Sequence, residues 1–380
     1  MKRINNEAEM KHMAKSTGRN GIIELMRFVF AMGVLLYHLC RTTHKGAVVL
    51  ASSGALDFTL FGNGFIGVDF FFILSGLFMA RSIYKKYQIV IEGGEATSPI
   101  HYGEDTIRFV WRKIKSLLPY YIPICILTFV LKICMDSKYG FQDFLSQLPS
   151  VFFLDRTGIS YNDLISGAWY LSSMFIVMLI LYPICVRYYR VFTVLIAPVV
   201  GLLSVGFLIH TYQVIGSGLN WVYIVSGANI RALASICLGT CCFEISRRMQ
   251  KKTFPVWARA LLSALALFGY GIALLYSCST MDSRFSGEAV LFLCVSITIS
   301  FSRKGLLGAG NWHSNNLFLY LGALSLPIYL SQNLFRKTIS KWFPGLDPWT
   351  QMLMMVIGTL LFSIIMHEII RIVRRIRKKA

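Results

Sequence analysis

Long apolar stretches separated by polar connections recur along nearly the whole chain. Each is close to the roughly 20 residues that a helix needs to cross the hydrocarbon core of a bilayer. The pattern predicts an all-α, polytopic bundle of ten membrane helices, at residues 21–40, 65–82, 117–135, 169–186, 191–210, 226–245, 258–278, 288–302, 317–335 and 351–370. Little of the chain remains for a separate soluble domain.

Two of the predicted connections are long. Residues 83–116 hold a glycine-rich, acidic stretch and then a segment with apolar side chains on one helical face and Arg108, Arg112 and Lys115 on another. That segment predicts an amphipathic helix in the membrane interface. Residues 136–168 are acidic and aromatic, and a lid over an outward-facing site and a plain connector fit them equally.

Composition and charge support a membrane protein. Of the 380 residues 55% are hydrophobic and 15% charged, and the mean hydropathy is +0.59. Of the 38 Lys and Arg residues, 27 fall on the side of the N-terminus, 8 on the other side and three inside predicted spans. This positive-inside asymmetry predicts a multi-pass plasma-membrane protein with one membrane domain, 21–370, and cytoplasmic basic tails, 1–20 and 371–380. The net charge of +20 therefore follows from the membrane topology and does not indicate nucleic acid as a partner.

The nine cysteines lie in or beside apolar stretches, without CxxC pairs or histidine spacing typical of zinc. We interpret them as small buried residues, including the adjacent Cys241 and Cys242. The sequence indicates no metal site.

The first predicted span carries ionisable residues in the stretch "LMRFVFAMGVLLYHL". Arg27 and His38 are eleven residues apart, so both project from one helical face, and Glu24 shares that face. Ionisable groups at membrane depth usually face the protein interior or a water-filled cavity. Positions near the two ends of the span would also let these side chains reach the headgroups. Spacing alone leaves both interpretations open.

The second span, "GVDFFFILSGLFMA", adds Asp69 near its outer end and Ser75 near mid-membrane. We expect Asp69 at a depth similar to His38. A histidine oriented by a carboxylate suits general-base removal of a proton from a hydroxyl. Asp69 is therefore predicted to orient His38.

Three further residues are candidates for contact with substrate. Trp169 and Tyr170 begin the fourth span, at the predicted outer mouth, where they would stack on a sugar or belong to the interfacial aromatic belt. Arg231 has no acidic residue nearby in sequence, so we expect a partner on another helix, either in a structural ion pair or beside a substrate site.

Four motifs, in order, carry a family resemblance: the Arg27-to-His38 spacing, "GVDFFFILSG", the basic cluster of "WRKIKSLLPYY" and "AWYLSSMFIVMLILYPI". With them the ten-span core resembles the acyltransferase-three family of integral membrane O-acyltransferases, of the type that O-acetylates cell-envelope sugars. The resemblance implies transfer of an acyl group, usually acetyl from acetyl-CoA, to a hydroxyl of a cell-envelope saccharide or glycolipid.

The resemblance also assigns residues. His38 matches the family's essential histidine, Arg27 its essential arginine, and Arg112 the first of a pair of arginines that would hold the CoA phosphates. The second position is Lys115, which keeps the charge without the bidentate fork. Met174 and Gln332 stand where many relatives have Glu and His, and these departures bear on the identity of the acceptor.

Two other classes of function also fit ten helices with a polar stripe. A transporter or flippase of a polysaccharide precursor would move substrate without consuming acyl-CoA. A structural or sensory membrane protein would tolerate apolar residues in place of Arg27 and His38. Neither class accounts for the four ordered motifs.

Overall fold

The computed structural model describes residues 20–54, 56–95, 99–136, 139–159, 164–165, 167–217, 220–306 and 315–379. Nearly all of the predicted N-terminal tail therefore lies outside the described residues. In the described part, ten helices are long and apolar enough to cross a membrane, which confirms the predicted number and the all-α fold class.

The elements follow one another in chain order. They are α2 (Gly21–Thr43), β1 (Val49–Ser52), β2 (Asp57–Thr59), α3 (Ile66–Ile91), α4 (Tyr102–Met135), α5 (Phe141–Val151), α6 (Trp169–Arg187), α7 (Tyr189–Val191), the π-helix η1 (Phe192–Ile196), α8 (Ala197–Tyr212), the 3-10 helix η2 (Ile215–Ser217), β3 (Trp221–Val222), β4 (Val225–Ser226), α9 (Gly227–Gln250), α10 (Val256–Ser277), the 3-10 helix η3 (Ser283–Phe285), α11 (Ser286–Ser302), α12 (Asn316–Trp342) and α13 (Pro348–Lys379).

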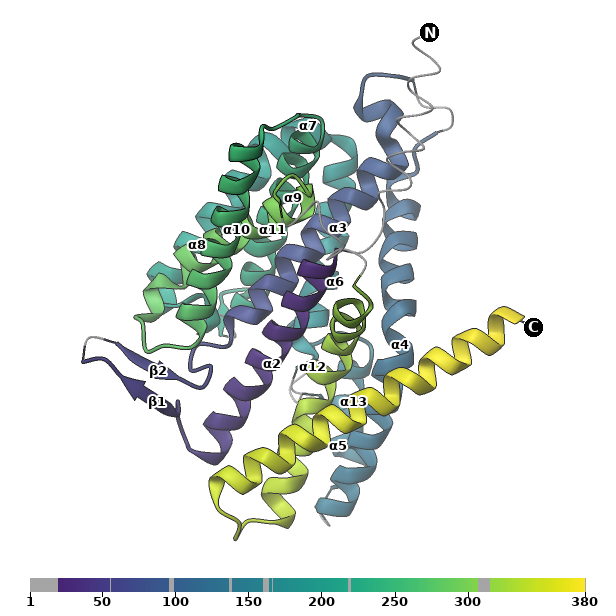
Figure 1. The fold of residues 1–380 in the computed structure, drawn as a ribbon. Coiled ribbons are helices and arrows are strands. Elements are labelled where there is room, and N and C mark those ends of the chain that lie inside the picture. The colour runs from purple at the N-terminus through teal and green to yellow at the C-terminus, as the bar shows by residue number, and fades with distance from the viewer. Residues whose placement is uncertain are drawn as a thin grey trace.

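Helix α3 occupies a central place in the bundle (Figure 1), where it contacts α9, α2, α6 and α11. Helices α8 and α10 flank α9 and α11, whereas α12 and α13 pack beside α2. We name the side of the bundle on which α2 begins and α3 ends the N-side. Helix α9 runs parallel to α3 and also ends on the N-side.

The contact between α3 and α9 depends on two glycines. A Cβ atom added to Gly76 would lie 2.0 Å from the carbonyl oxygen of Ile236, and one added to Gly239 would lie 2.0 Å from the carbonyl oxygen of Ile73. The two backbones therefore approach more closely than any side chain permits. Small residues at such positions are the usual basis of tight helix packing in membranes.

The start of α2 is fixed by Asn20. Its side-chain oxygen accepts hydrogen bonds from the backbone N–H groups of Ile22 at 3.1 Å and Ile23 at 3.4 Å, which satisfies donors that a helix N-terminus leaves free. Its amide nitrogen donates to the carbonyl of Ser300, near the end of α11, at 2.6 Å. The cap thus ties the first membrane helix to α11.

The predicted connection 83–116 differs from the structure, because most of it is helical. Helix α3 continues to Ile91, and α4 begins at Tyr102 and runs without interruption for 34 residues. At 1.5 Å per residue α4 is about 51 Å long, which exceeds a hydrocarbon core of about 30 Å. The basic segment is helical, as predicted, and it is continuous with the third membrane helix, whose first turns it forms.

The predicted connection 136–168 contains α5, which is anchored to α4. Lys132 donates to the side-chain oxygen of Gln147 at 2.6 Å, and the hydroxyl of Tyr121 donates to the carbonyl of Ser150 at 2.7 Å. Both accepting residues are buried. The described part of this connection thus covers the C-terminal part of α4.

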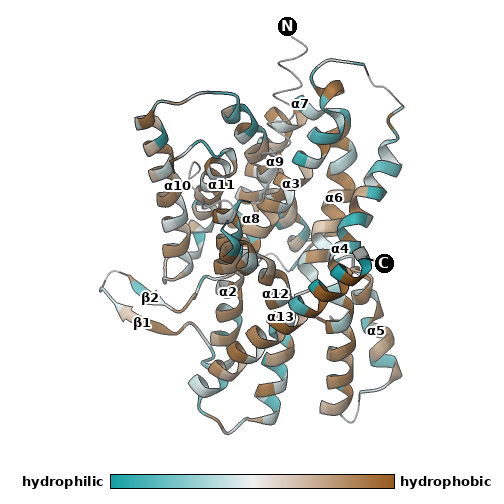
Figure 2. Cartoon of the chain, turned by 45° about the vertical axis from the view of Figure 1, so that its right-hand side comes forward, coloured by the Kyte–Doolittle hydropathy of each residue, from teal (hydrophilic) through white to brown (hydrophobic). Residues whose placement is uncertain are grey.

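Two short antiparallel hairpins, β1–β2 and β3–β4, complete the fold. Figure 2 shows that the helices are largely hydrophobic along their length, while hydrophilic residues gather in the connections and at helix ends such as those around α7. Apolar side chains on the outer helices, among them Leu203 and Phe268, are more than half exposed. Such a surface fits a bilayer and not water.

Replacing Gly239 by leucine tests the close α3–α9 approach. We expect a loss of stability of about 1–3 kcal/mol or more, because the added side chain overlaps the α3 backbone. Thermal unfolding in detergent, followed by tryptophan fluorescence, measures the loss. The control Gly271→Leu places a side chain where nothing lies within 4 Å, and equal melting temperatures for the two variants would contradict the packing argument.

Candidate active site

Glu24 and Arg27 form an ion pair in the first two turns of α2. An Arg27 Nη donates to Glu24 Oε2 at 2.7 Å, and the Glu24 side chain is only 6% exposed. Gly322 of α12 packs against this carboxylate, so closely that a Cβ there would lie 2.2 Å from the oxygen. The Arg27 side chain stays 26% exposed, and its other nitrogens make no hydrogen bond within the described residues. Arg27 thus keeps free donors at the edge of a buried pair.

His38 lies three turns farther along α2 and is partly exposed. Its ring packs against Tyr37, with ring centroids 5.2 Å apart. The charged side chains whose fields act on it are Arg336 of α12 and Arg41 of its own helix. Among the described residues no side chain or backbone group hydrogen-bonds to the imidazole. The ring nitrogens are available to a bound molecule.

Asp69 is paired with Arg231 of α9 and not with His38. Arg231 holds both carboxylate oxygens, through Nε at 2.9 Å and Nη at 2.6 Å, and Ser235 adds a hydrogen bond at 3.2 Å. Both ions are buried, with side chains 3% and 0% exposed. The interhelical partner that the sequence predicted for Arg231 is therefore Asp69, in a bidentate ion pair.

The expected contact between Asp69 and His38 was wrong for two geometric reasons. Gly67 packs on Phe30, so the outer part of α3 meets α2 about eight residues, or roughly 12 Å, deeper than His38. In addition, Asp69 projects from the α9-facing side of α3, whereas Gly67 and Phe70 face α2. Equal depth was inferred from sequence position, which the long connection before α3 makes unreliable.

Ser75, Trp169 and Tyr170 come together inside the bundle. The hydroxyl groups of Ser75 and Tyr170 are 3.4 Å apart, and the Tyr170 ring packs on Phe72 at 4.5 Å. The guanidinium carbon of Arg231 lies 5.9 Å from the Trp169 ring. Trp169 and Tyr170 are less than 10% exposed, so they belong neither to an outer mouth nor to an aromatic belt at the membrane surface.

Arg108, Arg112 and Lys115 stay apart from this interior cluster. All three are exposed on the projecting first turns of α4. Arg108 lies 3.9 Å from the nearest oxygens of Glu104 and Asp105, and Lys115 lies over the Trp111 ring at 5.4 Å. The structure thus provides an exposed basic strip on α4 that is not joined to Arg27 or His38 by any described contact.

Two buried amides lie next to each other on α12: Gln332, which the family resemblance had already linked to the acceptor, and Asn333, which sequence reasoning missed. Gln332 is 1% exposed, and in the part of the chain that the structure describes neither its amide nitrogen nor its amide oxygen has a hydrogen-bond partner; the amide oxygen of Asn333 also has none there. An unpaired buried amide costs free energy, so such a group indicates a missing polar partner. An asparagine inside an apolar span was the signal that could have revealed Asn333.

A polytopic helix bundle with ionisable side chains buried in its interior defines an integral membrane protein with an intramembrane polar site. The model of an acyltransferase-domain family matches residues 20–368, which includes all the residues of this site. The chain belongs to this family, acyltransferase-three, and is a membrane acyltransferase. No curated protein and no solved structure matches it.

The Asp69–Arg231 pair predicts strong coupling between two substitutions. Arg231→Met leaves a buried carboxylate without its partner, which we expect to cost about 3–5 kcal/mol of stability. The double variant Asp69→Leu/Arg231→Met removes both charges and should recover most of that loss. Thermal unfolding of the single and double variants in detergent gives the coupling energy. Additive losses would show that the two side chains do not stabilise one another.

Proposed function

We propose that the protein is an O-acyltransferase of the plasma membrane. It takes an acetyl group from cytoplasmic acetyl-CoA, the usual donor of the family that the chain resembles, and transfers it to a hydroxyl of an extracytoplasmic carbohydrate or glycolipid. The observation that carries the proposal is that one face of α2 presents both a His38 imidazole without a hydrogen-bond partner among the described residues and Arg27 donors that Glu24 does not use. With its positive-inside charge, the N-side is the cytoplasmic side.

His38 is proposed as the general base. Its nitrogen takes the proton of the acceptor hydroxyl while that oxygen attacks the carbonyl carbon of the thioester. The C–S bond then breaks, and the coenzyme thiolate takes the proton back from the imidazolium. A positioned base of this kind contributes about 10²- to 10⁴-fold to a rate. The absence of a competing hydrogen bond to the ring, within the described residues, supports this role.

Positive charge near His38 acts on both partners in this step, because it opposes the imidazolium and stabilises the negative charge of the attacked carbonyl. Attack on a thioester places negative charge on the carbonyl oxygen, and fixed cations beside the reacting atoms stabilise that charge. Arg336 and Arg41 supply such a field at His38. Asp69 has no part in orienting the base; its proposed role is to hold Arg231 and the wall of the site in place.

The donor would approach from the N-side. The exposed strip of Arg108, Arg112 and Lys115 offers cations for the CoA phosphates. From there the acyl-pantetheine arm would reach Arg27 and then His38, which are separated by about 16 Å along α2. An extended arm of this kind lets the donor and acceptor meet within the membrane without a soluble carrier.

The acceptor would be held by hydrogen bonds to unpaired groups inside the bundle. The Gln332 amide can donate and accept, as a sugar hydroxyl can. Asn333 adds an acceptor oxygen on the same helix. Ser75, Trp169 and Tyr170 form an adjacent wall of hydroxyl and aromatic groups, which suits a carbohydrate.

His38→Ala and His38→Asn should each lower the rate of acyl transfer at least about 100-fold, because the proton acceptor is lost. Mass spectrometry of envelope polysaccharides from cells with the wild-type protein, with the variant and without the protein detects the alkali-labile acyl ester. His210→Ala, which changes an exposed histidine of α8, is the control.

Labelled acetyl-CoA distinguishes the remaining outcomes. Consumption that depends on His38 supports transfer, whereas substrate movement without consumption would favour a transporter. Covalent labelling of the protein by the donor in the absence of an acceptor would show that an acyl-enzyme forms and would contradict direct transfer. Normal ester formation by both His38 variants would remove His38 as the base.

Gln332→Leu tests the acceptor contact. The substitution keeps the volume and removes an unpaired amide, so the melting temperature should stay the same or rise, while KM for the acceptor should rise about 3- to 10-fold. Thr359→Val removes another buried, unpartnered hydroxyl, on α13, and should leave KM unchanged. A parallel change of KM in both variants would contradict an acceptor role for Gln332.

A further inference from the structure

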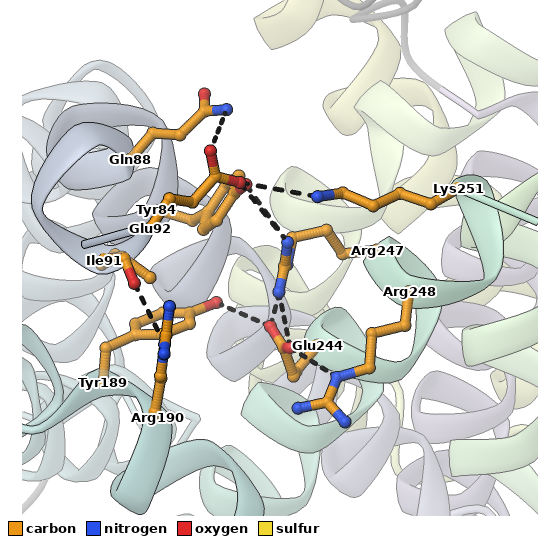
Figure 3. Close-up of polar contacts among 10 residues, drawn as sticks. All are labelled: Tyr84, Gln88, Ile91, Glu92, Tyr189, Arg190, Glu244, Arg247, Arg248 and Lys251. Carbon is orange, nitrogen blue, oxygen red and sulfur yellow. Dashed lines mark hydrogen bonds and ion pairs between the residues drawn. The ribbon is translucent and has the colours of Figure 1, made fainter. Parts of the chain in front are cut away.

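A second polar site lies on the N-side, where α3 and α9 end beside α7 and η1 (Figure 3). It is a cavity of about 740 Å³, which we name the N-side basin. Its lining residues are Ile91, Glu92, Tyr189, Arg190, Val191, Val194, Leu195, Glu244, Arg247, Arg248 and Lys251. None of these residues belongs to the Arg27–His38 site or to the basic strip on α4.

Glu244 organises the floor of the basin. Its carboxylate accepts from Arg247 at 2.7 and 2.9 Å, from Arg248 Nε at 2.8 Å and from the Tyr189 hydroxyl at 3.3 Å. The Glu244 side chain is 5% exposed, whereas that of Arg248 is 59% exposed. The buried acid therefore holds the inner edge of Arg248 and leaves its terminal nitrogens toward the open cavity.

Glu92 forms the second acidic contact, at the rim. It accepts a hydrogen bond from the Tyr84 hydroxyl and lies 3.6 Å from Lys251 Nζ and 3.9 Å from Arg247. The Tyr84 hydrogen bond, followed by those of Gln88 and Lys251, holds the pKa of the Glu92 carboxyl below its usual range. Glu92 is thus ionised at neutral pH, and its negative charge counts toward the net charge of the basin.

The net charge of the residues that line the basin is positive. Four cationic side chains line the basin against two carboxylates, which leaves two positive charges. Arg190 is exposed and pairs with no acid among the described residues; its Nε donates to the carbonyl of Ile91 at 3.1 Å. Its terminal nitrogens, like those of Arg248, remain as donors. Guanidinium groups in this state bind phosphate oxygens strongly.

Part of the lining of the basin is apolar. Val191, Val194 and Leu195 are 51%, 54% and 59% exposed, and the last two belong to the π-helix η1. Exposed aliphatic side chains on a membrane helix at the periphery of a bundle contact the acyl chains of lipids. Cationic and aliphatic side chains in the lining of one cavity match an amphiphile with an anionic head and suit a purely hydrophilic anion less well. Insertions of π-helix of this kind are frequent at functional sites.

We propose that the N-side basin binds an anionic phospholipid of the adjacent leaflet. Its phosphate lies between Arg190 and Arg248, with Lys251 at the rim, and its acyl chain lies along Val194 and Leu195. The recognised chemistry is a phosphate group, which the nucleotide of an acyl donor also carries. The lipid is favoured because exposed apolar residues line the basin. In addition, α3 lies between the basin and α2, since α3 contacts α9 with one side and α2 with another. This binding does not depend on the transferase reaction.

Native mass spectrometry of the delipidated full-length protein, titrated with phosphatidylglycerol or phosphatidylcholine, tests the site. We expect preferential binding of phosphatidylglycerol, and at least about tenfold weaker binding in Arg190→Gln/Arg248→Gln, because two charge-assisted contacts are lost. The charge-matched control Arg374→Gln/Arg375→Gln removes two exposed cations from α13 and should bind like the wild type. Equal binding by the basin variant and the wild type would overturn the proposal.

Two further measurements separate the sources of phosphate, and a third guards against misfolding. Val194→Asn should weaken phosphatidylglycerol binding without affecting binding of inorganic phosphate, because only the lipid uses the apolar part of the lining. Coenzyme A should fail to displace the lipid; displacement that requires Arg190 and Arg248 would assign the basin to the donor nucleotide instead. Melting temperatures in phosphatidylcholine should match the wild type for every variant, so that lost binding reports on the site.

Discussion

The buried ion pair between Asp69 and Arg231 is the constraint on which the arrangement of the central helices depends. Two charges removed from water cost several kcal/mol each unless every oxygen and donor finds a partner. Here the bidentate contact, Ser235 and the carbonyl of Phe65 supply those partners. The pair therefore fixes the register of α3 on α9, and the close approach at Gly76 fits only that register.

This register determines which side chains remain for chemistry. Since Asp69 faces α9, the α2-facing side of α3 presents apolar groups such as Phe70, and the ionisable face of α2 meets α12 instead. There Gly322 leaves space for Glu24, and Arg336 lies near His38. The histidine thus lies in the field of two arginines, and among the described residues no carboxylate hydrogen-bonds to it, which differs from the usual arrangement of a histidine base.

The same geometry separates two sites that both contain arginine. The Arg27–His38 site lies on the α2 side of α3, whereas the N-side basin lies where α3, α7, η1 and α9 meet. In the first site, Arg27 is tied to one buried acid and retains free donors. In the basin, Glu244 and Glu92 neutralise only half of the four cations. Burial and local neutralisation, and not the number of arginines, distinguish the two environments.

The sequence by itself determined the ten membrane helices, their order and the Glu24–Arg27 pair, because span length and the spacing of residues along one helix are local properties. The partner of Arg231, the burial of Trp169 and Tyr170 and the unpaired amide of Gln332 were decided by the tertiary structure. Each depends on which face of one helix meets another and at what depth, and the connections between spans do not encode that depth. Local periodicity therefore predicts the helices and the stripe on α2, while helix packing alone decides which polar groups meet.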